Sequence, residues 1–303
     1  MNILITGGTG LIGRAFIKQF DSHHYTVLSR SKVGASNKTT ALPEQVTLIH
    51  SLDHLQNLDL FDAVINLAGE PIIDKRWSAK QKQVIRDSRW LLTQQLVTLF
   101  ENSESPPAVF LNGSAIGVYG DRGAQDLTES FPVEVCDFPT QLCLGWEDIA
   151  QKASPHTRVV LLRTGIVLAS SGGALAKMLL PFKCFLGGRI GHGEQYMSWI
   201  HYQDHIHAMQ HVLLENTISG AVNLVAPDAQ KNSAFTKALA ASLNRVAILP
   251  VPKKVMQVLL GESACLLLDS QKVVPEKLLD NGFRFKFNTL KLALDDLLSS
   301  SAS

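Results

Sequence analysis

The first half of the chain alternates short apolar runs with longer segments of helical periodicity. Each apolar run ends at a glycine, a polar turn or the start of a helix. This alternation is typical of a parallel sheet whose strands are joined by crossover helices. The predicted strands are residues 2–6, 25–29, 46–50, 62–66, 108–113 and 159–163.

Helices are predicted between these strands. In the first, residues 11–20, the apolar side chains recur at a spacing that places them on one helix face. Two more helices are predicted at residues 79–100 and 140–152, and Pro106-Pro107 ends the linker after the longer one. The apolar face of the first helix consists of Leu11, Ile12, Ala15, Phe16 and Phe20.

The pattern changes after residue 170. Gly172 and Gly173 open a predicted helix that ends at Lys183, and a glycine-rich loop follows. This part predicts a smaller lobe over the carboxyl edge of the sheet, where open α/β folds bind their ligands. Its further elements are predicted as strands at 221–225 and 246–250, a helix at 233–243 and short helices to residue 298.

The predicted fold is therefore α/β: a Rossmann doubly wound parallel sheet with a smaller C-terminal α/β lobe. We expect residues 1–170 to form a dinucleotide-binding domain that also takes segments from 200–230. Residues 171–303 are expected to form the substrate lobe.

Composition and charge exclude several classes of protein. The 303 residues are 46% hydrophobic and carry a formal net charge of +1, without a basic block that would bind nucleic acid. No uncharged apolar run reaches the roughly 18 residues of a membrane span. The four cysteines form no CxxC pair, so neither a disulfide framework nor a metal site is expected. Free thiols and the lack of a signal peptide predict a soluble cytoplasmic protein; the oligomeric state stays open.

A glycine-rich turn directly after the first strand carries the strongest functional signal. Its glycines have the spacing GxxGxxG and precede an amphipathic helix. Glycine permits a tight turn and close approach of the backbone to a pyrophosphate, and the helix N-terminus offers unpaired N–H groups. We therefore expect a dinucleotide cofactor here. The predicted contacts are Gly7, Thr9, Gly10, Leu11, Ile12 and Gly13.

The end of the second strand indicates which dinucleotide is bound. NAD-binding folds place Asp or Glu about 20 residues after the glycine turn, where it binds the ribose 2′-hydroxyl. Here Arg30 occupies that position, and Ser29 lies beside it. A guanidinium pairs with a 2′-phosphate that a carboxylate repels. The predicted cofactor is therefore NADP(H).

Small residues follow the fourth strand as well. At this carboxyl edge they let the backbone pass close under a cofactor. The predicted contacts are Leu67, Ala68, Gly69 and Glu70.

The glycine turn, NLAG at 66–69 and SAIGVYG at 114–120 together resemble the extended short-chain dehydrogenase/reductase superfamily. Further segments narrow the resemblance to an atypical subgroup called epimerase family, or sugar-nucleotide epimerase-like, proteins. These segments include SR at 88–89, RTGIVL at 163–168, SWIHYQD at 198–204, SQKVVP at 270–275 and GFRF at 282–285.

The resemblance extends over nearly the whole chain. It implies a Rossmann fold with bound NADP(H) and a family-specific C-terminal region, here residues 250–297. It also adds Arg89 and Ser114 to the expected cofactor contacts. It supplies no firm reaction, because the substrates of the subgroup are largely unassigned.

Ordinary members of the superfamily use a serine and a Tyr-x-x-x-Lys pair, in which the tyrosine transfers a proton and the lysine lowers its pKa. No tyrosine of this chain has a lysine four residues later. Aligning Pro139 with the family's proline places Cys143 at the tyrosine position and Glu147 at the lysine position. Ala115 takes the serine position, with Ser114 one residue earlier. Because Glu147 disfavours a thiolate one helical turn away, we interpret Cys143 as a buried helix residue and Glu147 as a structural carboxylate.

The remaining catalytic candidates are Ser114 and Tyr119 after the fifth strand, Arg163, and His201 in a segment expected to line the cleft. Asp204 is expected to cap the helix that follows. His201 belongs to a histidine set with i,i+4 spacing, which a polar helix face explains without a metal. The set is His201, His205, His207 and His211.

Two functions remain open. In the first, the protein is an NADP(H)-dependent oxidoreductase or epimerase that acts on a small polar carbinol or a nucleotide-sugar, with acid–base groups other than the usual pair. In the second, it is a catalytically silent NADP(H)-binding redox sensor or regulatory protein. The superfamily resemblance favours the first, and the missing Tyr-x-x-x-Lys pair favours the second.

Overall fold

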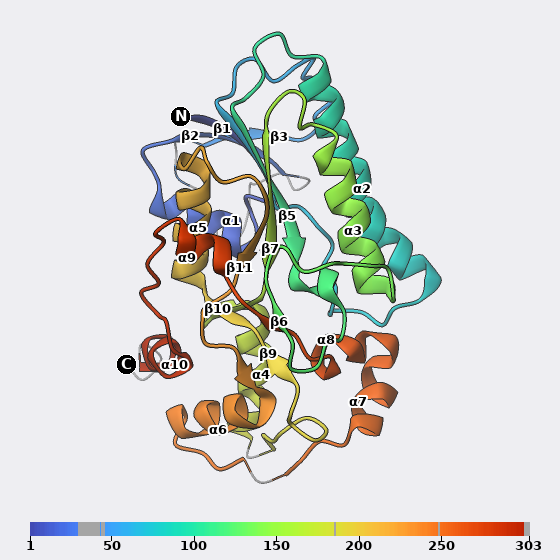
Figure 1. The fold of residues 1–303 in the computed structure, drawn as a ribbon, viewed down its shortest axis with the longest axis vertical. Coiled ribbons are helices and arrows are strands. Elements are labelled where there is room, and N and C mark those ends of the chain that lie inside the picture. Colours follow the sequence, from blue (N-terminus) through green and yellow to red (C-terminus); the bar gives the residue numbers. More distant parts are fainter. Residues whose placement is uncertain (30–42, 44–45, 185, 248, 300–303) are drawn as a thin grey trace.

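The computed structural model describes residues 1–29, 43, 46–184, 186–247 and 249–299 (Figure 1). Its centre is a seven-stranded parallel sheet in the order β11-β7-β5-β4-β1-β2-β3. The chain builds outward from β1 in both directions, which confirms the predicted doubly wound Rossmann topology. The strands are β1 (Asn2–Thr6), β2 (His24–Leu28), β3 (Val46–Ile49), β4 (Ala63–Asn66), β5 (Val109–Ala115), β7 (Arg158–Thr164) and β11 (Gly220–Leu224).

Helices cover both faces of this sheet (Figure 1). On one face lie α1 (Leu11–Gln19) and α5 (Tyr202–Leu214), and on the other lie α2 (Ala79–Glu101) and α3 (Phe138–Gln151). The strands are therefore buried on both sides, which explains why they read as continuous apolar runs in the sequence. Because α5 and β11 pack with the sheet, the chain returns to this layer between residues 200 and 230.

The side chains of each strand alternate between the two layers. In β1, Ile3 and Ile5 pack in the cluster that contains Phe16 of α1, whereas Leu4 packs in the cluster that contains Phe100 of α2. All five side chains are completely buried. This period of two fixes which face of every strand meets which helix layer.

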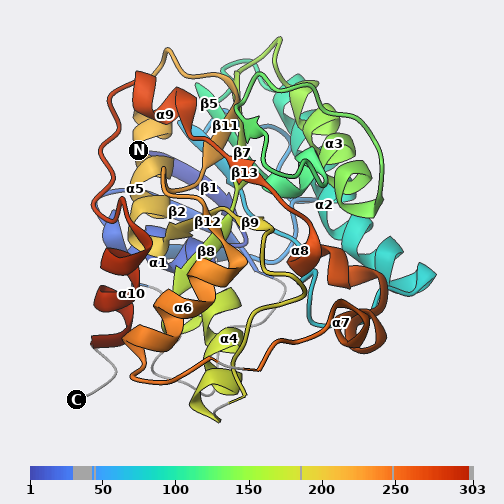
Figure 2. The same ribbon diagram turned by 60° about the horizontal axis from the view of Figure 1, so that its bottom comes forward.

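The remaining elements gather at one end of the molecule in both views (Figures 1 and 2). We call them the lobe. Trp199 and Phe235 are at its apolar core. The lobe contains the parallel pair β8 (Ile166–Ala169) and β10 (Trp199–His201), the antiparallel pair β9 (Tyr196–Met197) and β12 (Gln230–Lys231), and the helices α4 (Gly173–Lys183), α6 (Asn232–Ser242), α7 (Lys253–Leu260), α8 (Cys265–Leu268) and α10 (Leu290–Ser299).

Short elements connect the lobe to the sheet. The pair β6 (Asp126–Leu127) and β13 (Lys272–Val273) is parallel, and α9 (Glu276–Asp280) lies next to β11. Single turns of 3₁₀ helix follow β5 and precede α8, at η1 (Ile116–Tyr119) and η2 (Gly261–Ala264).

One predicted element is wrong. The described residues of segment 246–250 belong to no strand, and the neighbouring Val251 makes only an isolated parallel bridge with Ile190. The run ends at Pro250, and Pro252 follows two residues later; proline cannot donate the hydrogen bonds that a strand ladder needs. Elsewhere in the described ranges, no helix combines the length and the hydropathy of a membrane span.

Candidate cofactor and substrate cavity

A cavity of about 640 Å³ lies at the carboxyl ends of β1, β4, β5 and β7, between the sheet and the lobe. On the sheet side its wall includes the glycine turn, Gly69 and Ser114. On the lobe side it includes Met178 and Leu266. The cavity therefore occupies the edge at which open α/β sheets bind their ligands.

The glycine turn is shaped by contacts that a side chain would block. Gly7 has a φ of +70°, and a Cβ there would lie 2.7 Å from the carbonyl oxygen of Leu67. At Gly13 a Cβ would lie 2.5 Å from the carbonyl oxygen of Gly7. Gly10 is different, because its Cβ would approach only that same oxygen, at 3.1 Å, and the residue borders the cavity. Gly7 and Gly13 thus serve the fold of the turn, and Gly10 leaves room for a ligand.

The start of α1 is suited to an anion. Gly10 is its N-cap residue and provides no side-chain hydrogen bond to the first turn. The unpaired N–H groups and the positive end of the helix dipole therefore remain available to a phosphate group in the cavity.

Buried amides align the strand ends below this cavity. Thr6 Oγ1 donates to Asn66 Oδ1 at 2.6 Å, and Asn66 Nδ2 donates to Asn112 Oδ1 at 2.7 Å. Thr6 Oγ1 also accepts a bond from the backbone N–H of Ala68 at 3.3 Å. These bonds link the ends of β1, β4 and β5, and they hold the loop after β4 in place.

Arg89 supports the same loop from α2. Its Nη1 donates to the carbonyl oxygens of Glu70 and Ile85, both at 3.1 Å. A Cβ on Gly69 would lie 2.7 Å from the guanidinium carbon, so only glycine lets the loop rest on this side chain. Burial lowers the pKa of Arg89 below its ordinary value, and the nearby charge of Glu70 partly offsets this effect.

Most of the predicted cofactor contacts border the cavity, and some do not. The bordering residues are Gly7, Gly10, Leu11, Ile12, Gly13, Leu67, Gly69, Arg89 and Ser114. Four others do not border it: Thr9, Ser29, Ala68 and Glu70. Thr9 is half-buried in the turn, and Ser29 is buried after β2. The backbone N–H of Ala68 donates to Thr6, and the Glu70 carboxylate pairs with Lys75 at 3.0 Å. Arg30 lies outside the described residues.

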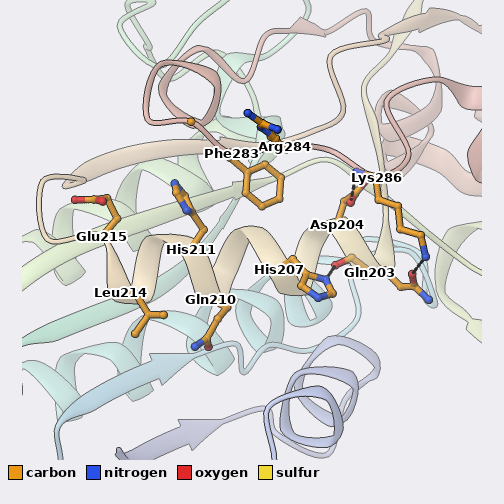
Figure 3. A pocket seen from close by; sticks show the side chains of 11 residues that line it. Gln203, Asp204, His207, Gln210, His211, Leu214, Glu215, Phe283, Arg284 and Lys286 are labelled. Carbon is orange, nitrogen blue, oxygen red and sulfur yellow. Dashed lines mark hydrogen bonds between the residues drawn. The ribbon is translucent and has the colours of Figure 1, made fainter.

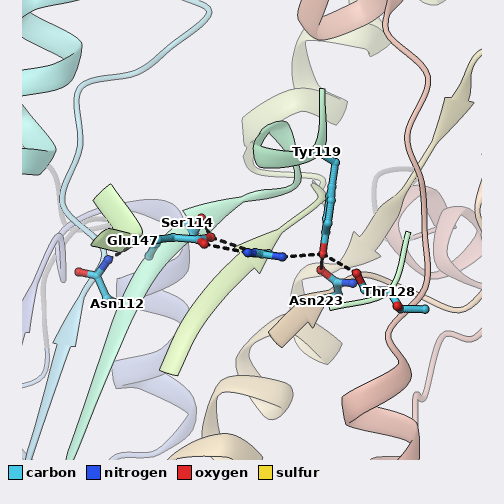
Figure 4. A network of polar contacts seen from close by, with 8 residues as sticks. Asn112, Ser114, Tyr119, Thr128, Glu147 and Asn223 are labelled. Carbon is cyan, nitrogen blue, oxygen red and sulfur yellow. Dashed lines mark hydrogen bonds and ion pairs between the residues drawn. The ribbon is translucent and has the colours of Figure 1, made fainter. Parts of the chain in front are cut away.

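Ser114 is held by a buried ion pair (Figure 4). Its hydroxyl donates to Glu147 Oε1 at 2.6 Å, and Arg163 donates to both oxygens of that carboxylate, at 2.9 and 2.8 Å. Glu147 and Arg163 are each 5% exposed. Burial alone lowers the pKa of Arg163, but the hydrogen bond and charge of Glu147 more than offset it, so the pKa is raised. The carboxylate at the family's lysine position is thus a structural partner of Arg163.

Tyr119 belongs to the same network but does not border the cavity. Its hydroxyl donates to Asn223 Oδ1 at 2.7 Å and accepts from Arg163 Nη1 at 3.0 Å (Figure 4). The side chain is completely buried, and burial raises its pKa. The sequence placed Tyr119 near the reacting groups, whereas the structure directs its hydroxyl toward β11.

Cys143 borders the cavity at the family's tyrosine position. Burial, followed by the charge of Glu147, raises the pKa of its thiol to about 12. The thiol therefore stays protonated near neutral pH, in agreement with its interpretation as a buried helix residue.

His201 does not line the cavity, so its predicted position is wrong. The ring is completely buried and stacks on Phe287 at 3.7 Å, and its Nδ1 accepts from the backbone N–H of Gln203 at 3.1 Å as the cap of α5. Burial lowers its pKa to about 4. Because His201 caps the helix, Asp204 does not. Its carboxylate instead accepts from the backbone N–H groups of Lys286 and Phe287, at 2.9 and 2.8 Å.

The other histidines do not converge on a metal. His207 and His211 border an open hollow of about 630 Å³ between α5 and segment 282–286 (Figure 3). His205 is buried instead, with Nε2 3.1 Å from Thr164 Oγ1. Among the residues that the structure describes, no three histidine, cysteine or carboxylate side chains are grouped to hold a metal ion.

Sequence reasoning missed most of the lobe side of the cavity. Because these residues belong to elements far apart in the chain and are mostly apolar, they carry no local motif. The residues missed there include Met178, Tyr196, Met197, Leu266 and Asp269.

Comparisons with known proteins agree with this geometry. Residues 3–224 match the NAD dependent epimerase/dehydratase family, and residues 251–297 match a domain of unknown function (DUF1731). The second match coincides with the predicted family-specific region. An epimerase family protein of Staphylococcus aureus (strain MRSA252) is 38% identical over 300 residues, which cover 98% of each chain.

Two solved structures are also similar. The human epimerase family protein SDR39U1 (isoform 2) with NADPH is 33% identical and has a TM-score of 0.90, with 99% of both chains covered. A nucleoside-diphosphate sugar epimerase from Corynebacterium glutamicum is 28% identical and has a TM-score of 0.77, with 99% of this chain and 58% of that chain covered. From the fold, the cavity and these matches, the chain belongs to the NAD dependent epimerase/dehydratase family, and it carries the additional C-terminal domain of unknown function.

Proposed function

We propose that this protein binds NADP(H) and acts as an oxidoreductase or epimerase on a small carbinol or carbonyl compound. The observation that carries the proposal is one continuous cavity, bordered by Gly10 at the glycine turn, by Ser114 at the end of β5 and by Met197 in the lobe. A dinucleotide bound at the turn therefore has space beside it for a second molecule. The human relative whose structure contains NADPH supports the choice of cofactor.

The residues present fit a dinucleotide. Gly7 and Gly13 allow the tight turn, and Gly10 with the start of α1 presents backbone N–H groups to a pyrophosphate. Arg30 is the residue expected to pair with a 2′-phosphate, as its position after β2 predicts.

A bound nicotinamide would supply or accept the hydride. The role of the protein is then to position the carbinol oxygen. Since the Ser114 proton is directed to Glu147 at 2.6 Å, the serine oxygen presents a lone pair and accepts a hydrogen bond from a carbinol hydroxyl or an amide. Cys143 remains a neutral thiol and a weak donor.

A second function is favoured by a different observation. The chain has no Tyr-x-x-x-Lys pair, and the residues at those two positions are a thiol with a pKa of about 12 and a carboxylate bonded to Arg163. A redox sensor that binds NADP(H) without turnover needs no proton-transfer pair. The two functions differ in whether a bound cofactor leaves its nicotinamide accessible from the cavity.

Titration of the protein with NADPH and NADH tests the cofactor. We expect NADPH to bind at least about tenfold more tightly, a difference of about 1.4 kcal/mol. Arg30→Ala should abolish this preference and leave NADH binding nearly unchanged. Lys18→Ala, which removes an exposed cation near the far end of α1, is the control. Equal affinities in the wild-type protein would contradict the assignment.

Turnover separates the enzyme from the sensor. NADPH absorbance is followed with a panel of aldehydes and ketones. Ser114→Ala should lower turnover about a hundredfold, the scale of losing an acid–base or orienting group, and change NADPH affinity only a few-fold. Unchanged turnover would refute the role of Ser114. Absence of turnover, together with a crystal structure in which side chains cover the nicotinamide, would establish the sensor.

A further inference from the structure

The charges on the cavity wall are few and unevenly placed. Three charged residues border the cavity in the described part of the chain: Arg89, Asp137 and Asp269. Arg89 belongs to the sheet side, where its guanidinium rests against Gly69 and donates to the carbonyl oxygen of Glu70. The other two are carboxylates. The net charge that faces a substrate from the α3 and α8 side is therefore negative.

The two carboxylates come from different elements. Asp137 is the N-cap of α3 and accepts from the backbone N–H of Thr140 at 2.8 Å. Asp269 follows α8 and is partly buried. Burial, followed by the charges of Asp121 and Asp137, raises the pKa of Asp269 to about 6. Both Asp137 and Asp269 border this end of the cavity, and Asp121 lies close enough to act on Asp269 as well.

Nearby cations do not neutralise this end. Lys231 and Lys272 both lie over the ring of Tyr196, which borders the cavity. Each already pairs with another carboxylate at 2.7 Å, Lys231 with Glu194 and Lys272 with Asp126. The charge of Lys253 lowers the pKa of Asp269, but this effect is smaller than the combined effect of burial and the neighbouring carboxylates, so the pKa stays raised.

The rest of the lobe wall is uncharged. Met178, Met197 and Leu266 are apolar, and Gln271 is neutral. The N-termini of α3 and α4 both border the cavity. That of α4 lies beside the glycine turn, because a Cβ on Gly173 would approach Leu11 Cδ2 to 3.2 Å, so its dipole favours an anion next to that turn. That of α3 is capped by the Asp137 carboxylate, whose charge offsets the helix dipole.

A nucleotide-sugar does not suit such a wall. Its diphosphate carries two negative charges, and transferring them from water into a partly apolar cavity requires cations or several hydrogen-bond donors. From the start of α3 and from the lobe it would instead meet Asp137, Asp269 and apolar side chains.

We propose that the substrate is a small uncharged or cationic carbonyl or carbinol compound without a phosphate group, and that its polar end faces Asp137 and Asp269. This inference rests on the proposed function for the assignment of the cavity to a substrate. It narrows the substrate class by excluding nucleotide-sugars.

The charge that faces the cavity can be measured with a thiol inside it. Cys265 borders the same cavity, and burial with the charges of Asp269 and Asp137 raises its pKa to about 12. A variant that keeps Cys265 as its sole thiol carries Cys136→Ser, Cys143→Ala and Cys184→Ser. The measurement is its rate of modification by two methanethiosulfonates of similar size, one with a trimethylammonium group and one with a sulfonate.

For each state of the protein, the modification rate with the cationic reagent is divided by the rate with the anionic reagent. We expect this rate ratio to be about fivefold or more higher in the folded protein than in urea, since the folded cavity attracts cations. Asp269→Asn in this background should lower the ratio toward the unfolded value. Glu104→Gln removes an exposed carboxylate from the loop before β5, at the opposite edge of the sheet, and should leave it unchanged. A ratio equal to or below the unfolded value, or one unaffected by Asp269→Asn, overturns the proposal.

Calorimetry of the NADPH-loaded protein with UDP-glucose and UDP-glucuronic acid gives a second measurement. We expect no binding up to about 1 mM, and a dissociation constant below about 0.1 mM for either compound overturns the proposal. The ratio of Cys265 modification rates is measured without a cofactor. A protein that fails to bind NADPH but keeps the high ratio therefore refutes the proposed function and leaves the charge of the cavity established.

Discussion

Arg163→Met tests whether the ion pair with Glu147 holds the cavity wall in place. The substitution removes two hydrogen bonds to the carboxylate, at 2.9 and 2.8 Å, and leaves only the 2.6 Å bond from Ser114. Since Glu147 is 5% exposed, its charge would stay buried without a partner. Breaking a buried pair in this way costs about 3–5 kcal/mol. Tyr119 also loses a donor at 3.0 Å, which adds about 1 kcal/mol.

The assay is equilibrium unfolding in urea of the wild type, Arg163→Met, Glu147→Leu and the double variant. Each single variant leaves one buried charge alone, and we expect each to lose several kcal/mol. The double variant removes both charges. Its free energy of unfolding should therefore exceed the value predicted by adding the two single effects, by about 2 kcal/mol or more. Additive effects, or a loss below about 1 kcal/mol in Arg163→Met, would refute the structural role of the pair.

The remaining predictions concern the glycine turn and two buried histidines. Gly10→Ala should fold normally, because its Cβ meets only one backbone oxygen, at 3.1 Å, and should lose NADPH affinity, because the residue borders the cavity. Gly13→Ala should unfold at a lower urea concentration, because its Cβ would lie 2.5 Å from the carbonyl oxygen of Gly7. Circular dichroism and NADPH titration check both variants, and equal effects of the two would contradict this division. Burial lowers the pKa of His205 from 6.5 to about 3, so the unfolded chain binds a proton that the folded chain does not, and stability falls as the pH falls through this window. His205→Gln should reduce the slope of unfolding free energy against pH by about 1.4 kcal/mol per pH unit near pH 5, and an unchanged slope would contradict a neutral buried imidazole. His201→Ala should lower stability through the lost α5 cap and ring stacking and leave kcat nearly unchanged, which steady-state kinetics on any active carbonyl compound would check.

The sequence by itself determined the central sheet and the cofactor turn. Short apolar runs located the strands within one or two residues, because β1, β4, β5 and β7 are covered on both faces. The Gly7 to Gly13 spacing located the turn because it is a local requirement: Gly7 and Gly13 are needed by contacts within the turn or with the segment after β4, and Gly10 by the approach of a ligand. The single isolated bridge at Val251 marks the limit of this reasoning, since an apolar run becomes a strand only where a partner strand is available.

The tertiary structure decided which side chains reach the cavity. Ser114 and Tyr119 are five residues apart, yet Ser114 borders the cavity, whereas the turn at Ile116–Tyr119 directs the Tyr119 hydroxyl toward Asn223. His201 caps a helix and packs under Phe287, a contact between residues 86 positions apart that no local pattern records. Asp269 borders the cavity because the segment after α7 folds back over the sheet edge. Strand and turn signals depend on neighbours in sequence, whereas the direction of a side chain at a strand end depends on packing between distant segments.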